Sequence, residues 1–121
     1  MDWIILAVTV LLLIAYLSLR RTGQISENGA ADHLQNGALI IDVRNPGEFA
    51  AGHLERAINM PLPQIDSMIG ARVTDKNQVL LLHCQSGSRS GMARKRLIAL
   101  GYTQAYNLGS YERAARIVGR G

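Results

Sequence analysis

Two short, nearly continuous apolar runs constrain the fold of this chain more than any other feature. They cover residues 38–43 and 79–83, and each ends in polar or loop-forming residues. Runs of this length without polar alternation are typical of strands that are covered on both faces, as in parallel sheets. Helical patterns stand before, between and after the two runs. The sequence therefore predicts a three-layer α/β/α domain with a mainly parallel sheet.

The remaining elements are shorter. We expect helices over about residues 30–35, 46–50, 62–71, 91–100 and 111–118, and short strands over 57–59 and 104–107. Pro46 stands near the first position of its helix, and Gly37 and Gly101 follow the ends of two others, as these residues commonly do. The chain has 121 residues, which allows one domain with a modest core. We place this domain at residues 29–121.

A third apolar stretch, residues 3–19, carries no charge. As a helix, these positions would span roughly 26 Å, close to the hydrocarbon thickness of a bilayer of about 30 Å. Trp3 and Tyr16 lie near its two ends, where amphipathic aromatic side chains favour the membrane interface. We therefore expect a transmembrane anchor over residues 1–21, followed by a polar tether over 22–28.

A cleaved signal peptide and a buried soluble helix are the alternatives for this stretch. A signal peptide would have a basic segment before the apolar residues, but here only Met1 and Asp2 precede them. A helix that is apolar on every face needs more surrounding protein than this chain offers. Because Arg20 and Arg21 follow the stretch, the positive-inside rule predicts a single-pass membrane protein with its domain in the cytoplasm, as at a bacterial inner membrane.

Charge and composition narrow the range of ligands. The net charge of +4 suits anionic lipid surfaces or small anionic substrates. We expect no nucleic-acid partner, because the basic residues are not interleaved with aromatic ones. One cysteine and three scattered histidines show no metal-ligand spacing, so we expect no metal and no cofactor. A single cysteine also fits a reducing compartment.

That cysteine, Cys84, directly follows the second apolar run and precedes a Gly/Ser loop and a helical pattern. A thiol in this position meets backbone N–H groups and the positive end of a helix dipole, and both stabilise the thiolate. Ligands of parallel sheets bind beyond the carboxyl ends of the strands. We therefore expect this loop to hold a nucleophile or to bind an anion, and Cys84 is the candidate catalytic nucleophile. An inert buried cysteine is the alternative, but a strand end before such a loop is a poor place to bury one.

The loop after Cys84 is the expected substrate-binding site, because its N–H groups can surround a sulfur anion. Gly87 allows the loop to curl, and the serine hydroxyls can donate hydrogen bonds. Arg89 has two roles that stay open: attracting an anionic donor, or pointing outward and holding the loop through a carboxylate. The expected substrate-binding residues are Gln85, Ser86, Gly87, Ser88, Arg89 and Ser90.

Several segments together resemble a single-domain rhodanese. They are Asp42-Val43-Arg44, Glu48-Phe49, Gly52-His53-Leu54, Ala57-Ile58-Asn59-Met60-Pro61 and the loop from His83 to Ser90. The resemblance implies a sulfurtransferase in which Cys84 takes sulfane sulfur from thiosulfate or a persulfide. The resulting Cys84 persulfide would pass the sulfur to a thiol or protein acceptor, here at the cytoplasmic face of a membrane.

Neighbouring polar residues are expected to support this site without reacting. We expect Asp42 and Arg44 to form a polar network beside the loop, together with Glu48. His53 matches the rhodanese Gly-His position, where it would fix the backbone. His83 is expected to be a core histidine rather than a general base, because adjacent side chains of a strand point to opposite faces.

Two segments depart from the rhodanese pattern. Glu55-Arg56-Ala57 replaces a small glycine-containing link, and the C-terminal segment 107–112 lacks the usual paired glycines and the tryptophan that follows them. The last helix is short and basic, with Arg113, Arg116 and Arg120. These departures leave the substrate and the partner open. Gln85 stands where thiosulfate-specific enzymes often have arginine, which favours a persulfide donor.

The spacing from Cys84 to Arg89 separates related chemistries. Four residues lie between them, whereas the phosphatases that resemble this family place five between cysteine and arginine. A shorter ring suits a single sulfur atom better than a phosphoryl group. Phosphatase or arsenate reductase activity remains an alternative, as does a non-catalytic module that recruits a membrane partner.

Overall fold

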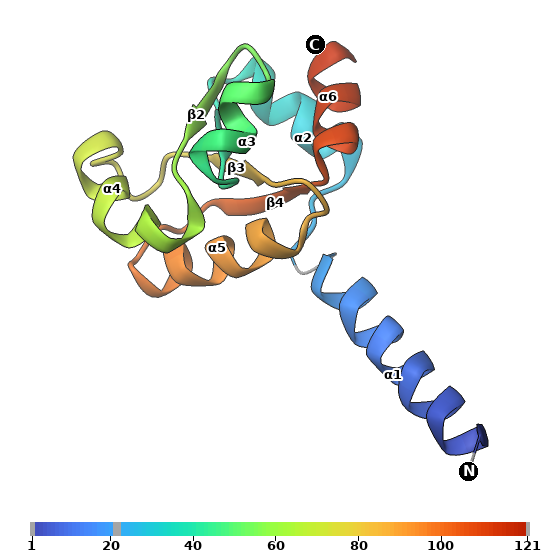
Figure 1. Ribbon diagram of the computed structural model, residues 1–121. Coiled ribbons are helices and arrows are strands. Elements are labelled where there is room, and N and C mark those ends of the chain that lie inside the picture. Colours follow the sequence, from blue (N-terminus) through green and yellow to red (C-terminus); the bar gives the residue numbers. More distant parts are fainter. Residues whose placement is uncertain (1, 21–22, 121) are drawn as a thin grey trace.

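The computed structural model describes residues 2–20 and 23–120 (Figure 1). Its four strands form one sheet in the order β2-β1-β3-β4, and every neighbouring pair is parallel. The strands are β1 (Leu39–Asp42), β2 (Ala57–Asn59), β3 (Leu80–His83) and β4 (Ala105–Gly109). The predicted parallel sheet is therefore confirmed. Its carboxyl edge brings the ends of β1, β3 and β4 side by side.

Helices cover both faces of this sheet (Figure 1). The helices that pack on the sheet are α2 (Glu27–Gln35), α4 (Ile65–Arg72), α5 (Ser88–Ala99) and α6 (Tyr111–Arg120). Leu82 packs in a core cluster with residues of α4 and α5, whereas its neighbour Leu81 packs in a second cluster with residues of α2 and α6. Consecutive side chains of a strand alternate between its faces, which explains the two clusters. The three-layer α/β/α architecture is confirmed.

Several element boundaries differ from those expected. Helix α2 begins at Glu27 because the Ser26 side chain caps it, accepting a hydrogen bond from the Gly29 N–H group at 3.1 Å. Helix α5 begins at Ser88, three residues earlier than expected, so the end of the cysteine loop is already its first turn. Gly87 allows this early start, because its φ of 99° turns the chain directly before the helix.

Two further segments complete the domain. The segment expected as one helix over residues 62–71 is a short 3₁₀ turn, η1 (Leu62–Gln64), followed by α4. Pro46 starts helix α3 (Pro46–Ala51), as its fixed φ favours. Residues 23–25, which belong to the expected polar tether, lie along β4, where the Ile25 N–H group donates to the Asn107 carbonyl at 3.0 Å.

The N-terminal helix α1 (Asp2–Arg20) extends away from the domain (Figure 1). Its large apolar side chains are exposed, for example Trp3 at 72% and Leu11 at 65%. Crossing a bilayer takes about 20 consecutive, mainly apolar residues. The described part of the chain contains no helix that combines the necessary length and apolar character. The transmembrane anchor predicted over residues 3–19 is therefore not supported. Residues 21 and 22, where the anchor was expected to meet the tether, lie outside the described residues.

Candidate active site

Cys84 lies at the carboxyl end of β3, in the middle of the sheet. Its N–H group donates to the Gly109 carbonyl at the end of β4, at 3.3 Å. The side chain is fully buried. Its Sγ accepts a hydrogen bond from the Gly87 N–H group at 3.0 Å and lies 3.5 Å from Ser90 Oγ. The loop and the first turn of α5 thus provide a set of donors around one sulfur atom.

Ser90 and Asn107 connect this loop to β4. The single hydroxyl proton of Ser90 has three acceptors within reach: Asn107 Oδ1 at 2.7 Å, the Gly87 carbonyl at 3.1 Å and Cys84 Sγ at 3.5 Å. The Asn107 amide also donates to the Gly87 carbonyl at 3.0 Å and accepts from the Gly109 N–H group at 2.9 Å. Because Asn107 is fully buried, its amide fixes the loop relative to the sheet. The sequence analysis did not include Asn107 among the site residues. The available signal was a polar amide side chain inside a predicted strand.

Asp42 and Arg44 form a buried ion pair at the end of β1. Arg44 Nε and Nη2 donate to the Asp42 carboxylate at 3.0 and 2.8 Å, and this bond is the main reason why the pKa of Arg44 is raised. Arg44 also donates to the Gly52 carbonyl at 2.8 Å and to Gln85 Oε1 at 3.4 Å. The pair therefore joins β1, the segment after α3 and the first residue of the cysteine loop.

Arg89 makes a two-point ion pair with Glu48 of α3, at 2.6 and 3.0 Å. The hydrogen bond from Arg89 lowers the pKa of Glu48 to about 2. In turn, Glu48 raises the pKa of Arg89, and Cys84 adds a smaller contribution of the same sign. Glu48, which was expected beside Asp42 and Arg44, thus has its ion pair with Arg89. This pair fastens the loop to α3 and keeps a positive charge close to the sulfur.

The contacts of the two histidines of the resemblance are to groups other than Cys84 Sγ. His83 is fully buried, with Nδ1 at 3.2 Å from the Cys84 carbonyl and Nε2 at 3.6 Å from an Asp42 carboxylate oxygen. Burial lowers the pKa of His83, which Asp42 partly opposes. His53 places Nδ1 at 2.8 Å from the Phe49 carbonyl and stacks on the Phe49 ring, at the end of α3. Both therefore contact the backbone and side chains that surround the site. Within residues 2–20 and 23–120, no three potential metal ligands gather.

Comparison with known proteins matches residues 26–115 to the family model of the rhodanese-like domain. Thiosulfate sulfurtransferase PspE of Escherichia coli is 39% identical over 69 residues, which cover 57% of this chain and 66% of the relative. A solved structure described as a rhodanese with anions from E. coli shares 35% identity, with a TM-score of 0.61, over 64% of this chain and 91% of its own.

The human single-domain sulfurtransferase TSTD1 superposes with a TM-score of 0.64 at 27% identity, over 78% of this chain and 96% of its own. The chain spans 46% to 66% of the length of three curated relatives that it matches.

Proposed function

The chain belongs to the rhodanese-like domain family, and we propose that it is a sulfurtransferase that carries sulfane sulfur as a persulfide on Cys84. The observation that carries this proposal is the position of Sγ at the end of β3, with the Gly87 N–H group at 3.0 Å and the Ser90 hydroxyl at 3.5 Å. The names of relatives support it, since PspE of E. coli is a thiosulfate sulfurtransferase and TSTD1 a single-domain sulfurtransferase.

The first half-reaction loads the cysteine. With thiosulfate as donor, the Cys84 thiolate attacks the outer sulfur, and a new S–S bond forms at Sγ. The S–S bond of thiosulfate breaks, and its electron pair leaves with sulfite. The negative charge then resides on the terminal sulfur of the persulfide. Hydrogen-bond donors that are already in position stabilise such a charge more than mobile water does.

The surrounding ion pairs favour the same step. Arg89 keeps a positive charge near the sulfur while Glu48 restricts its movement, and the buried Asp42–Arg44 pair holds the start of the loop. Cys84 is fully buried, which shields Sγ from bulk water.

Intact-mass spectrometry after incubation with thiosulfate or a glutathione persulfide tests the proposal. We expect the wild-type chain to gain the mass of one sulfur atom and the Cys84→Ser variant to gain none. Cyanide should then remove the added sulfur as thiocyanate. If neither donor loads Cys84, the proposal is wrong and the non-catalytic module becomes the better interpretation. Cys84-dependent hydrolysis of an aryl phosphate or reduction of arsenate, without sulfur loading, would favour the other alternative.

A further inference from the structure

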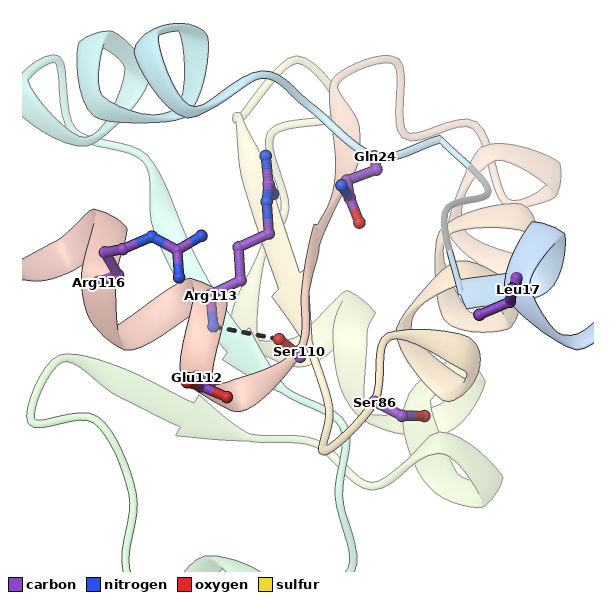
Figure 2. A pocket seen from close by; sticks show the side chains of 7 residues that line it. All are labelled: Leu17, Gln24, Ser86, Ser110, Glu112, Arg113 and Arg116. Atoms are coloured by element: carbon purple, nitrogen blue, oxygen red, sulfur yellow. Dashed lines mark hydrogen bonds between the residues drawn. The ribbon is translucent and has the colours of Figure 1, made fainter.

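A polar pocket of about 300 Å³ lies beside the cysteine loop, on the side of helix α6 (Figure 2). Ser86 of the loop lines one part of it. Ser110, Arg113 and Arg116, which follow β4, line another part. Glu112 also contributes to the lining, and Arg116 forms a partly exposed ion pair with Glu27 at 3.0 Å.

Backbone hydrogen bonds hold this pocket close to the nucleophile. The Cys84 N–H group donates to the Gly109 carbonyl, and the Tyr111 N–H group donates to the Gln85 carbonyl, both at 3.3 Å. The residues on either side of Ser110 are therefore bonded to the two residues that precede Ser86. A molecule in the pocket would lie against the same loop that holds the reactive sulfur.

Arg113 is the central cation of the pocket. Its guanidinium donates to the carbonyls of Leu108 at 2.7 Å and Ile25 at 2.5 Å, and no carboxylate among the described residues forms an ion pair with it. Burial lowers the pKa of Arg113 and Arg116 lowers it further, whereas Glu27 opposes both. The positive charge of Arg113 is thus only partly compensated, and an anion beside it would stabilise that charge.

The backbone at the end of β4 lets Arg113 lie close to the strand. Gly109 has a φ of 101°, and a Cβ atom at this position would lie 3.1 Å from Arg113 Cδ and 3.2 Å from Gln24 Oε1. The absence of a side chain therefore lets Arg113 and Gln24 approach the strand end closely. Figure 2 shows that Arg113 stands between Arg116 and Gln24.

We propose that this pocket binds the carboxylate of a small thiol that accepts sulfur from Cys84. The inference rests on the proposed sulfur transfer. A carboxylate can accept charge-assisted hydrogen bonds from the N–H groups of Arg113 and Arg116 that do not already donate to the Leu108 and Ile25 carbonyls or to Glu27. The pocket volume of about 300 Å³ has room for a small organic thiol that carries a carboxylate.

The chemistry of the second half-reaction explains the need for positive charge. The acceptor enters as its thiolate and attacks the outer sulfur of the Cys84 persulfide. An S–S bond forms to the acceptor, the bond to Sγ breaks, and the electron pair returns to Cys84 as its thiolate. Two anions have to approach each other in this step, so Arg113 and Arg116 lower the repulsion when they hold the carboxylate.

Single-turnover kinetics of the preloaded persulfide test the pocket. The chain is loaded with thiosulfate and mixed with 3-mercaptopropionate, which carries a carboxylate, or with neutral 2-mercaptoethanol, and both rates are compared at equal thiolate concentration. We expect the preference for the carboxylate thiol to fall about fivefold in Arg116→Gln, as the loss of one partly exposed charge contact implies. Arg113→Gln should reduce it at least as much, and Arg72→Gln on the distant helix α4 should leave it unchanged.

The outcomes separate the pocket from the underlying activity. Failure of the wild-type chain to load sulfur would overturn the proposed function and this inference together. If Arg113→Gln and Arg116→Gln load sulfur normally and keep the preference for 3-mercaptopropionate, the pocket does not bind the acceptor, although the proposed function stands. The same conclusion follows if Arg72→Gln loses the preference equally. If Arg116→Gln slows loading by thiosulfate as much as transfer to 3-mercaptopropionate, the pocket does not belong to the acceptor. Arg113→Lys keeps the positive charge but not the planar guanidinium. We expect this variant to load sulfur normally and to show a reduced preference for 3-mercaptopropionate, which would show that the variant is folded and that binding is affected.

Discussion

Replacing Asn107 by alanine should weaken the fold more than replacing Ser90, although only Ser90 reaches the sulfur. Among the described residues, Asn107→Ala removes the bond from Ser90 Oγ at 2.7 Å, the bond from the Gly109 N–H group at 2.9 Å and the bond to the Gly87 carbonyl at 3.0 Å. The amide is fully buried, so the free energy of these bonds is lost without direct compensation by bulk water.

The structure shows which partners would be left unpaired. The Gly87 carbonyl still accepts from the Gly91 N–H group and from Ser90 Oγ, both at 3.1 Å. The buried Gly109 N–H group loses its Asn107 acceptor. One unpaired buried donor and the lost hydrogen bonds together correspond to about 2–4 kcal/mol of unfolding free energy. Ser90→Ala leaves Asn107 Oδ1 paired with Gly109, so we expect a loss of only about 1 kcal/mol.

Equilibrium unfolding in urea measures both losses. The midpoint of Asn107→Ala should fall well below that of Ser90→Ala, with similar m values in both variants. Sulfur loading of Cys84 provides a second measurement, because the loop positions the two donors near Sγ, the Gly87 N–H group and the Ser90 hydroxyl. If Asn107→Ala costs less than about 1 kcal/mol, or no more than Ser90→Ala, then the amide does not hold the loop as described.

Three further predictions concern the ion pairs and the backbone around the site. Because Arg89 holds the pKa of Glu48 at about 2, below the ordinary 4.5, the pair stabilises the fold above pH 4.5 and this contribution is lost as the pH falls through 2. Since the pair is about one third exposed, we expect Glu48→Gln to lower the free energy of unfolding by about 1 kcal/mol at pH 7. The difference between the urea midpoints of the wild type and the variant should shrink toward pH 2, and a constant difference would contradict this assignment. Arg44→Met should lower the free energy of unfolding by about 3–5 kcal/mol, because Asp42 stays buried without its partner. Adding Asp42→Asn should recover part of this loss, and no recovery in the double mutant would show that the two residues are not coupled. Gly109→Ala should cost about 1–2 kcal/mol in thermal unfolding, since its φ of 101° is unfavourable for a residue with a side chain, and an unchanged melting temperature would refute that conformation.

Much of the fold follows from local patterns in the sequence. The apolar runs at 38–43 and 79–83 contain β1 and β3, because a short continuous apolar segment between loops has few other structures available. The position of Cys84 at a strand end follows in the same way, since a Gly/Ser loop and a helical pattern come directly after it. Such local patterns leave boundaries less certain, and helix α5 accordingly begins at Ser88 rather than at 91.

Local hydropathy was a weaker guide at the N-terminus. The uncharged stretch at 3–19 predicted a transmembrane anchor, which the described residues do not support. The tether beside it was expected from its polar composition alone. Its pairing with Asn107 depends on where β4 lies in the sheet, and strand order is not encoded in composition.

Contacts between distant segments of the chain hold the site together. Arg89 pairs with Glu48, which lies 41 residues away in the chain, and Asn107 reaches the loop from a different strand. Both contacts depend on the register of parallel strands and on the helices that connect them, so no pattern within a short window reveals them. Local sequence patterns were enough to predict the parallel α/β sheet and a cysteine at a strand end. The folded chain decided which carboxylate, which amide and which arginines surround that cysteine, because these residues meet only when distant segments pack against one another.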